Sequence, residues 1–177
     1  MKKQKGFSLI ELLIVVAIIL IIAAIAIPNL LRSKIAANES SAVGSVRTIG
    51  TAEVTYSSSW GSGFASNLQK LGGPSPCVTA TATAACLIDP LLSAATANKS
   101  GYTFNAMGTF PDTSTPPVLN GFDVVANPVT LQTTGVRSFC DDQSGVVKFQ
   151  VATPIALGQG NCAAILTAAG VSGPVGN

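Results

Sequence analysis

Residues 7–31 read FSLIELLIVVAIILIIAAIAIPNLL, an apolar stretch of 25 residues that is interrupted only by Ser8, Glu11, Pro28 and Asn29. At 1.5 Å per residue, a helix of this length can cross a hydrocarbon layer of about 30 Å. We call residues 7–31 the apolar segment. Its length and composition predict a membrane-spanning helix near the start of the chain.

Three lysines, Lys2, Lys3 and Lys5, precede the apolar segment. Because basic residues gather on the cytoplasmic flank of membrane helices, they predict a cytoplasmic N-terminus with the bulk of the chain outside. A secretory signal peptide cleaved after Ala24-Ile25-Ala26 is one alternative, and a plain single-pass anchor is another. The apolar segment is longer than the usual signal-peptide core of about 7–15 residues, which disfavours the first alternative.

Glu11 lies inside the apolar segment, where a carboxylate costs on the order of 2.5–3.5 kcal/mol. Neither alternative explains that cost, so Glu11 indicates a function and needs a cation at the same depth. If the chain were cut after Gly6, the nitrogen of Phe7 would become an amine four residues away, on the same helical face as Glu11. We therefore expect Glu11 to pair with the Phe7 amine.

The residues around this junction are Lys5-Gly6-Phe7-Ser8-Leu9-Ile10-Glu11-Leu12-Leu13-Ile14-Val15-Val16, and Ala26-Ile27-Pro28-Asn29-Leu30-Leu31 follow further on. They resemble the class III leader and N-terminal helix of type IV pilins and type II secretion pseudopilins. The resemblance implies that a prepilin peptidase cleaves between Gly6 and Phe7 and methylates the Phe7 nitrogen. It also implies that Glu11 helps to dock a new subunit onto a filament, and that the helix melts locally before Pro28 in that filament.

A weaker similarity to the C-terminal half of some bacterial pilins lies at Val124-Val125, Val136-Arg137-Ser138-Phe139 and Asp142-Gln143-Ser144-Gly145-Val146. Taken together, the resemblance implies a structural subunit of a type IV pilus, and no enzyme. The implied partners are further copies of the chain in a helical homopolymer, the prepilin peptidase, an inner-membrane assembly platform and, before assembly, membrane lipid. The implied location is the bacterial inner membrane, with a periplasmic head, and then a cell-surface pilus.

Two other functions stay open. The first is a type II secretion pseudopilin in a periplasmic fibre, although the major pseudopilins typically hold calcium in an acidic C-terminal loop and this sequence has no Asp or Glu after Asp142. The second is a membrane-anchored binding module that does not polymerise. A pseudopilin assembles in the periplasm and a pilin at the cell surface, so the place of assembly distinguishes these two. A binding module that does not polymerise would not sediment as a fibre in sheared surface material.

The helical pattern continues past the apolar segment, from Phe7 to about Ser58. Pro28 lacks an N–H and crowds the carbonyl of Ala24, so we expect a kink there. Beyond Leu31, apolar residues recur at helical spacing and predict one buried face. They are Ile35, Ala42, Val46, Ile49, Tyr56 and Trp60.

The charged residues of this outer part lie on other faces and are expected to be solvated. They are Arg32, Lys34, Glu39, Arg47 and Glu53. Gly44 and Gly50 each weaken a helix by about 1 kcal/mol relative to Ala, and close packing against a strand is the plain reason for keeping them. We therefore divide the chain into a leader (1–6), a transmembrane and assembly half-helix (7–31), an amphipathic half-helix (32–60) and a globular head (61–177).

The head begins where Gly, Pro, Ser, Thr and Ala become frequent, and Gly72-Gly73-Pro74-Ser75-Pro76 marks a break. Asp89 followed by Pro90 predicts the cap of a short helix over residues 90–97. Four strands are predicted, at Tyr102–Met107, Phe122–Ala126, Val136–Cys140 and Val146–Val151. One long helix followed by short strands predicts an α+β fold, with a small antiparallel sheet packed on the helix.

Four cysteines, Cys77, Cys86, Cys140 and Cys162, allow three pairings, and the expected orientation places them outside the membrane, where disulfides persist. Pairing of sequence neighbours gives Cys77–Cys86 and Cys140–Cys162, each worth roughly 3 kcal/mol. The resemblance supports the second pair, because type IV pilins commonly close a C-terminal loop in this way. A zinc site is disfavoured because no C-x-x-C spacing occurs.

The composition excludes several classes of function. The chain has no histidine, which removes Ser/His/Asp triads and histidine-ligated metals. A formal net charge of +2, without a basic stripe beyond the first five residues, gives no reason to expect nucleic acid as a primary partner. Asp141 and Asp142 are expected in a solvated turn, with calcium as a minor alternative. We expect no cofactor, no metal and no catalytic residue.

Overall fold

The computed structural model describes residues 7–165 and 170–176. The chain divides into two compact units, Met1–Lys34 and Ile35–Asn177, and helix α1 (Leu9–Trp60) belongs partly to each. The predicted leader, residues 1–6, and with it Gly6 of the predicted cleavage site, lie outside the described residues.

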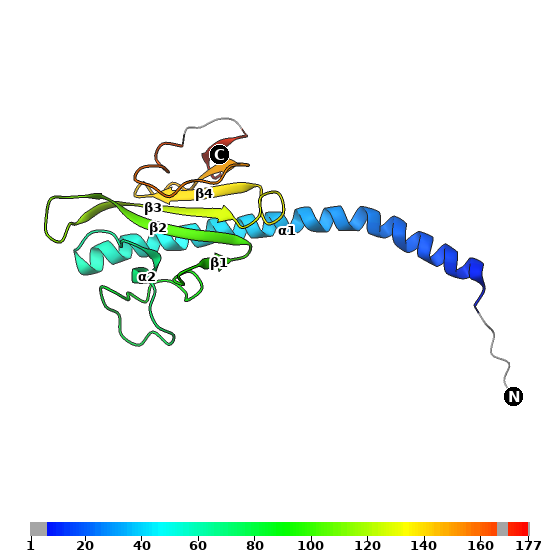
Figure 1. Cartoon of the computed structure of the whole chain (residues 1–177), viewed down its shortest axis with the longest axis horizontal. Helices are drawn as coiled ribbons and strands as arrows, with labels where there is room; N and C mark the ends of the chain where they lie inside the picture. The colour runs from blue at the N-terminus through cyan, green and yellow to red at the C-terminus, as the bar shows by residue number, and fades with distance from the viewer. Residues whose placement is uncertain (1–6, 166–169, 177) are drawn as a thin grey trace. The chain divides into compact units, whose positions relative to one another are not determined.

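Helix α1 matches the predicted helix to within two residues at each end (Figure 1). It begins after Ser8, and Glu11 in its first turn accepts a hydrogen bond from the Ser8 amide at 2.9 Å. This is one half of the Ser-x-x-Glu capping box, which satisfies an amide that the first turn leaves without a helical partner. The helix runs through Pro28 without a break, and the expected kink stays a prediction.

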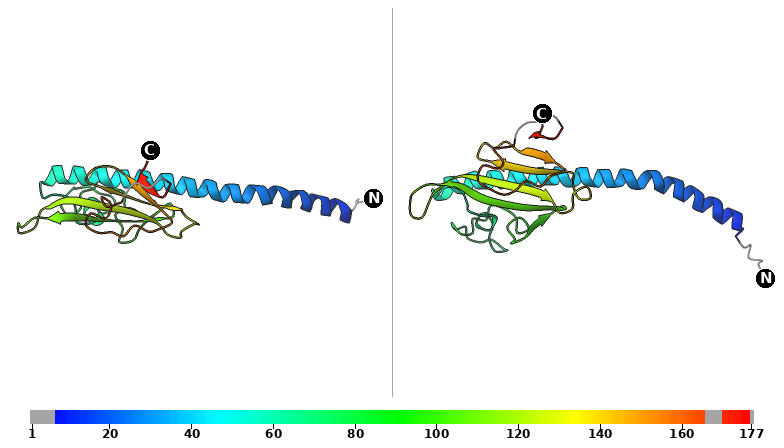
Figure 2. Two further views of the ribbon diagram at one scale, coloured as in Figure 1. Left: turned by 90° about the horizontal axis from the view of Figure 1, so that it is seen from above. Right: turned by 45° about the horizontal axis from the view of Figure 1, so that its top comes forward.

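The second unit contains a six-stranded antiparallel sheet in which each strand pairs with the next in sequence (Figures 1 and 2). The α+β fold predicted from the sequence is confirmed. Its strands are β1 (Ala97–Lys99), β2 (Tyr102–Pro111), β3 (Leu119–Pro128), β4 (Arg137–Asp142), β5 (Lys148–Val151) and β6 (Ser172–Pro174).

The outer part of α1 covers one face of this sheet, as the view from above shows (Figure 2). The predicted apolar face of the helix is confirmed at Ala42, Val46, Ile49 and Tyr56, which are all buried. They share one core with aromatic side chains of the sheet, whose burial supplies much of the hydrophobic stabilisation. The largest of these aromatic residues are Tyr102, Phe104, Phe122 and Phe139.

Alternation along the strands gives the sheet a second buried face. On β3, Val124 belongs to the core beneath α1, whereas Val125 packs with Cys140, Ile155 and Cys162 in a separate small cluster. Consecutive residues of a strand point to opposite faces, so this second cluster lies on the face away from the helix. The C-terminal part of the chain covers it.

Three short elements were not predicted: β1, β6 and the four-residue helix α2 (Leu68–Leu71). The prediction of a helix over residues 90–97 is wrong, because only a turn forms there before β1 begins at Ala97. Asp89 still caps that turn, accepting from the amides of Leu91 (2.9 Å) and Leu92 (3.0 Å). The four predicted strands are confirmed; β2, β3 and β4 are longer than expected, and β5 is shorter.

Candidate assembly segment and anchoring carboxylates

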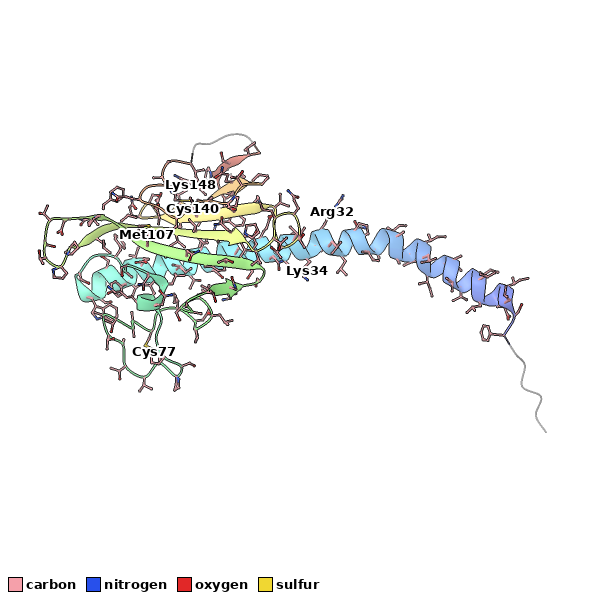
Figure 3. All side chains as sticks on the ribbon, in the orientation of Figure 1. Arg32, Lys34, Cys77, Met107, Cys140 and Lys148 are labelled. Atoms are coloured by element: carbon pink, nitrogen blue, oxygen red, sulfur yellow. A yellow bond between two sulfur atoms is a disulfide. The ribbon has the colours of Figure 1, made fainter. Side chains whose placement is uncertain are left out.

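The apolar segment exposes almost all of its side chains. Its large apolar residues, from Phe7 to Leu31, have exposed fractions between 44% and 85%, and their side chains project on all sides of the helix (Figure 3). Monomeric soluble proteins rarely expose contiguous apolar patches beyond a few hundred Å². By length and composition, α1 is the one helix among the described residues that is able to cross a membrane.

Glu11 is the single ionisable residue among residues 7–31. In the uncleaved chain the nitrogen of Phe7 belongs to a peptide bond, so the expected pairing of Glu11 with a Phe7 amine stays a prediction. The Ser8 amide is instead the partner of Glu11. The Ser8-x-x-Glu11 spacing could have revealed this contact from the sequence, because it is the signature of a capping box. Pro28, the other predicted assembly residue, is exposed within the helix.

Glu39 was expected to be solvated, and that expectation is wrong. Its side chain is only 8% exposed and forms an ion pair with Arg137 at 2.7 Å. It also accepts from the backbone amides of Val136 (2.9 Å) and Arg137 (3.1 Å) at the start of β4. The carboxylate thus ties α1 to the sheet, and the guanidinium is held further against the rings of Phe139 and Phe149.

Glu53 was also expected to be solvated, but it is fully buried. Its Oε2 accepts from the amide of Ala65 at 2.8 Å, while Oε1 has no hydrogen-bond partner among the described residues. Burial raises the pKa of Glu53 to about 8, and the bond from Ala65 opposes this only in part. Glu53 is therefore protonated in the folded protein at neutral pH.

The solvated turn expected at Asp141 and Asp142 is likewise wrong, since both residues are buried at the end of β4. Asp141 faces α1 at Gly50, where a Cβ would overlap its Oδ2 atom. Burial raises the pKa of Asp141 to about 6. Gly50 is therefore required by close packing, whereas a Cβ at Gly44 would have open space around it.

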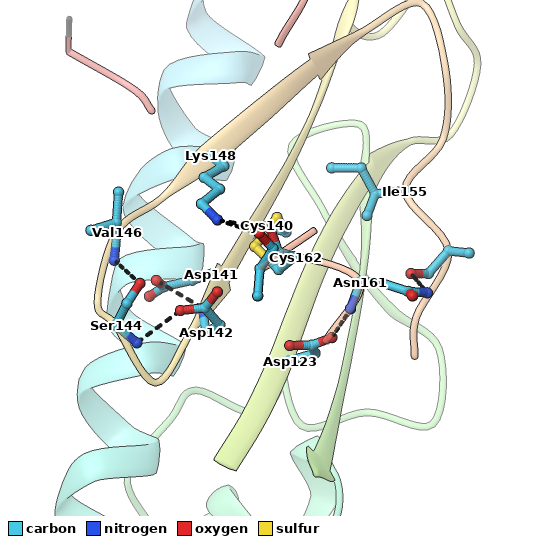
Figure 4. The surroundings of a disulfide bond; sticks show 12 residues. Asp123, Cys140, Asp141, Asp142, Ser144, Val146, Lys148, Ile155, Asn161 and Cys162 are labelled. Atoms are coloured by element: carbon cyan, nitrogen blue, oxygen red, sulfur yellow. Dashed lines mark hydrogen bonds between the residues drawn. A yellow bond between two sulfur atoms is a disulfide. The ribbon is translucent and has the colours of Figure 1, made fainter. Parts of the chain in front are cut away.

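The opposite face of the sheet carries Asp123, which holds the C-terminal part of the chain (Figure 4). Its Oδ2 accepts from the amide of Asn161 at 3.0 Å. Beside it, Lys148 donates to the carbonyls of Cys162 (3.0 Å) and Ala163 (3.1 Å). The Cys140–Cys162 disulfide joins the same stretch to β4, so three kinds of bond fix the C-terminal loop.

The structure joins Cys77 to Cys86 and Cys140 to Cys162, the two pairs that neighbour pairing gave. Cys140 and Cys162 are fully buried in the outer cluster, whereas Cys77 is exposed. Among the described residues there is no group of three or more His, Cys, Asp or Glu side chains that could hold a metal ion. The arrangement is suited to joining the outer part of α1 to the sheet.

Comparisons with known proteins find sequence similarity over part of this chain. Residues 1–27 match a sequence family described as the prokaryotic N-terminal methylation motif. The type IV wide pilus major component PilA4 of Thermus thermophilus is 62% identical over 39 residues, which cover 22% of this chain and 30% of that protein. The type IV major pilin protein PilA of Myxococcus xanthus is 45% identical over 54 residues, which cover 30% and 24%.

The matched part of the chain thus spans 30% and 24% of the length of these two curated relatives. No solved structure matches the chain significantly. The resemblance to type IV pilins inferred from residues 5–31 is confirmed by the matching family and by both relatives.

Proposed function

We propose that this chain is a structural subunit of a type IV pilus, which polymerises through its apolar segment into a surface filament. The observation that carries the proposal is the exposure of every large apolar side chain from Phe7 to Leu31. Such a surface needs lipid around it before assembly and other helices around it afterwards. The matches to a methylation motif and to two major pilins support the same function.

Lipid tails are as apolar as leucine, so the hydrophobic effect alone does not move a helix from a membrane into a filament. A polar contact that forms in the filament but not in the membrane can supply the free energy that favours assembly. Glu11 is the one ionisable residue of the apolar segment, and we assign this contact to it. In the proposed mechanism, its carboxylate leaves the Ser8 amide and binds the amine of Phe7 on a neighbouring subunit.

That amine exists only after processing. We propose that the prepilin peptidase cleaves between Gly6 and Phe7, which removes Lys2, Lys3 and Lys5 together with the leader. The peptidase then methylates the new amino group, which keeps its positive charge and remains able to pair with Glu11. In a low-dielectric bundle, this pairing is stronger than in water, and either charge left alone is costly.

The outer part of α1 serves as a rigid stalk for the head. Glu39 fixes it to β4, and Glu53 fixes it to the segment that follows the helix. The head is then carried outside the membrane, and the subunit passes from the inner membrane to the cell surface through an assembly platform. No step in this role requires catalysis by the chain.

Substitution of Glu11 tests the proposal. Glu11→Ala is expected to leave membrane insertion and cleavage intact and to reduce sheared filaments at least about tenfold, because leaving the Phe7 amine unpaired in a buried bundle costs more than about 1.4 kcal/mol. Glu11→Gln separates charge from hydrogen bonding, and Leu12→Ala is the matched control for loss of side-chain volume. Each variant is expressed as the only pilin, and filaments are counted by electron microscopy.

Normal filament numbers with Glu11→Ala would contradict the assigned role of Glu11. An uncleaved Glu11→Ala chain would move that role to recognition by the peptidase. Fibres confined to the periplasm, in the unaltered protein, would indicate a type II secretion pseudopilin instead of a pilus.

A further inference from the structure

A surface groove runs along the outer part of α1, on the side that faces the end of β4 and the β6 region. It consists of two open pockets of about 370 Å³ and 350 Å³, and Arg47 lines both of them. We call it the Arg47 groove. It is also lined by Val43, Gly44, Val54, Arg137 and Val175. Three buried acidic residues belong to the lining as well, Asp141 and Asp142 in the first pocket and Glu39, which is paired with Arg137, in the second.

Arg47 is an exposed cation without a partner among the described residues, where the ion pairs are Lys99–Asp89 and Arg137–Glu39. The carboxyl group of Asp141, which lines the first pocket but is almost fully buried, feels the charge of Arg47 without forming an ion pair with it. The floor of the groove at Gly44 is open, since nothing lies within 4 Å of a Cβ placed there. The groove thus combines an available guanidinium with room for the backbone or small side chains of another segment.

The residues between β2 and β3 form a hairpin tip that presents a carboxylate. Asp112 Oδ1 accepts from the Ser114 amide (3.0 Å), the Ser114 hydroxyl (2.5 Å) and the Val118 amide (2.8 Å). These bonds fix the carboxylate, hold its pKa below the ordinary value and leave Oδ2 free of any hydrogen bond to the described residues. The tip residues 112–117 are all exposed.

Asp112 is the natural partner for Arg47 because the other carboxylates of the second unit are occupied or hidden. Asp89 is paired with Lys99. The remaining five are buried, namely Glu39, Glu53, Asp123, Asp141 and Asp142. Among the described residues of the second unit, Asp112 therefore stands alone as an exposed carboxylate without a cation.

The two surfaces are separated along the axis of α1. The β2–β3 tip projects beyond the C-terminal end of the helix in all three views (Figures 1 and 2). Arg47 precedes Trp60, the last residue of α1, by 13 residues, which corresponds to roughly 20 Å along the axis. The tip and the groove of one chain therefore cannot meet each other.

We propose that the Arg47 groove of one subunit receives the Asp112 tip of a second copy of this chain. A contact between two different surfaces, offset along one axis, joins subunits head to tail and extends into an open helical filament. This inference rests on the proposed function and deepens it by naming a contact between heads. It adds a charge-dependent interface outside the membrane to the helix bundle formed by the apolar segments.

Zero-length cross-linking tests the contact in assembled fibres. The Arg47→Lys variant keeps the charge and supplies an amine that carbodiimide can couple to a carboxylate in direct contact. Sheared fibres are treated, separated under denaturing conditions and digested. We expect chains linked in pairs and longer series, with a peptide in which Lys at position 47 is joined to Asp112. The same variant with Asp112→Asn, which retains the Oδ1 acceptor, is expected to lose the product.

A steric variant tests the same groove without changing charge. Gly44→Leu fits the isolated subunit, because the position is open, but fills the groove floor. Thr48→Leu, on an exposed position of the same helix that lines a different pocket, is the matched control. We expect Gly44→Leu to lower the yield of sheared fibres about tenfold relative to Thr48→Leu, the change that a loss of about 1.4 kcal/mol produces.

Fibres that form normally but give no peptide linking positions 47 and 112, or that link position 47 only to Asp141 of the same chain, would overturn the inference and leave the proposed function standing. Failure of the unaltered chain to form fibres would overturn the proposed function and this inference together.

Discussion

The protonated carboxyl of Glu53 predicts that the head is less stable in mildly alkaline than in mildly acidic solution. Glu53 is fully buried in α1, and its Oε1 atom has no partner among the described residues. Desolvation raises its pKa from 4.5 to about 8. Ionisation in place would put an unpaired charge inside the core, which the folded state avoids by keeping the proton.

The sign and size of the effect follow from proton linkage. Below about pH 4.5 both the folded and the unfolded chain keep the proton on Glu53, and this residue costs nothing. Between pH 4.5 and 8 the unfolded chain releases the proton while the folded chain retains it, so stability falls as pH rises. At 1.36 kcal/mol per pH unit, a shift from 4.5 to about 8 corresponds to a loss of roughly 5 kcal/mol.

Glu53→Gln removes this ionisation while keeping an oxygen that can accept from the Ala65 amide. We expect the variant to be the more stable protein at pH 8 and to show a much shallower decline between pH 6 and 8. Asp141, with a pKa raised to about 6, should leave a residual decline that fades as the pH rises through 6 and is nearly complete by about pH 7. The assay is urea unfolding of the full chain in mild detergent at intervals from pH 4.5 to 9, followed by Trp60 fluorescence. Equal slopes for both proteins between pH 6 and 8 would refute the reasoning.

The other predictions concern the joints of the head, and each is measured by urea unfolding at pH 6. Glu39→Ala is expected to lower the free energy of unfolding by about 2 kcal/mol, because it leaves two backbone amides at the start of β4 without their acceptor and removes the ion pair of Arg137, whose side chain is 41% exposed. A loss of unfolding free energy below about 1 kcal/mol would show that this contact contributes no more than an ordinary surface ion pair. Gly50→Ala should destabilise by about 1–3 kcal/mol through overpacking, whereas Gly44→Ala should stabilise by up to about 1 kcal/mol; equal effects would contradict the packing. Replacing Cys140 and Cys162 by serine should cost about 3 kcal/mol or more, and free thiols in the native protein on peptide mapping would exclude the bridge.

Helix α1 and the central strands could be predicted because their patterns are local. The helix has a long apolar run followed by a stripe at helical spacing, and β2 to β5 each contain β-branched or aromatic residues. β1 and β6 contain Ala-Asn-Lys and Ser-Gly-Pro, which have no strand preference of their own. They form strands because their backbones pair with the edges of β2 and β5.

The burial of Glu39 and Glu53 could not be predicted for a different reason. A carboxylate on a helix is usually solvated, and its burial depends on donors that are distant in sequence. The partners of Glu39 lie 97 and 98 residues further along the chain, at Val136 and Arg137. The spacing of residues within the helix does not indicate these partners. The capping contact between Ser8 and Glu11 is local, and the sequence did contain its signature.

The proposed function requires that this chain is processed after Gly6 and that it polymerises through its apolar segment. Intact-mass and N-terminal analysis of sheared surface fibres measures both. We expect fibres built of this chain, beginning at an N-methylated Phe7 and containing two disulfides. A chain recovered as a soluble protein that begins at Ile27, after Ala24-Ile25-Ala26, would contradict it, as would surface fibres that lack this chain.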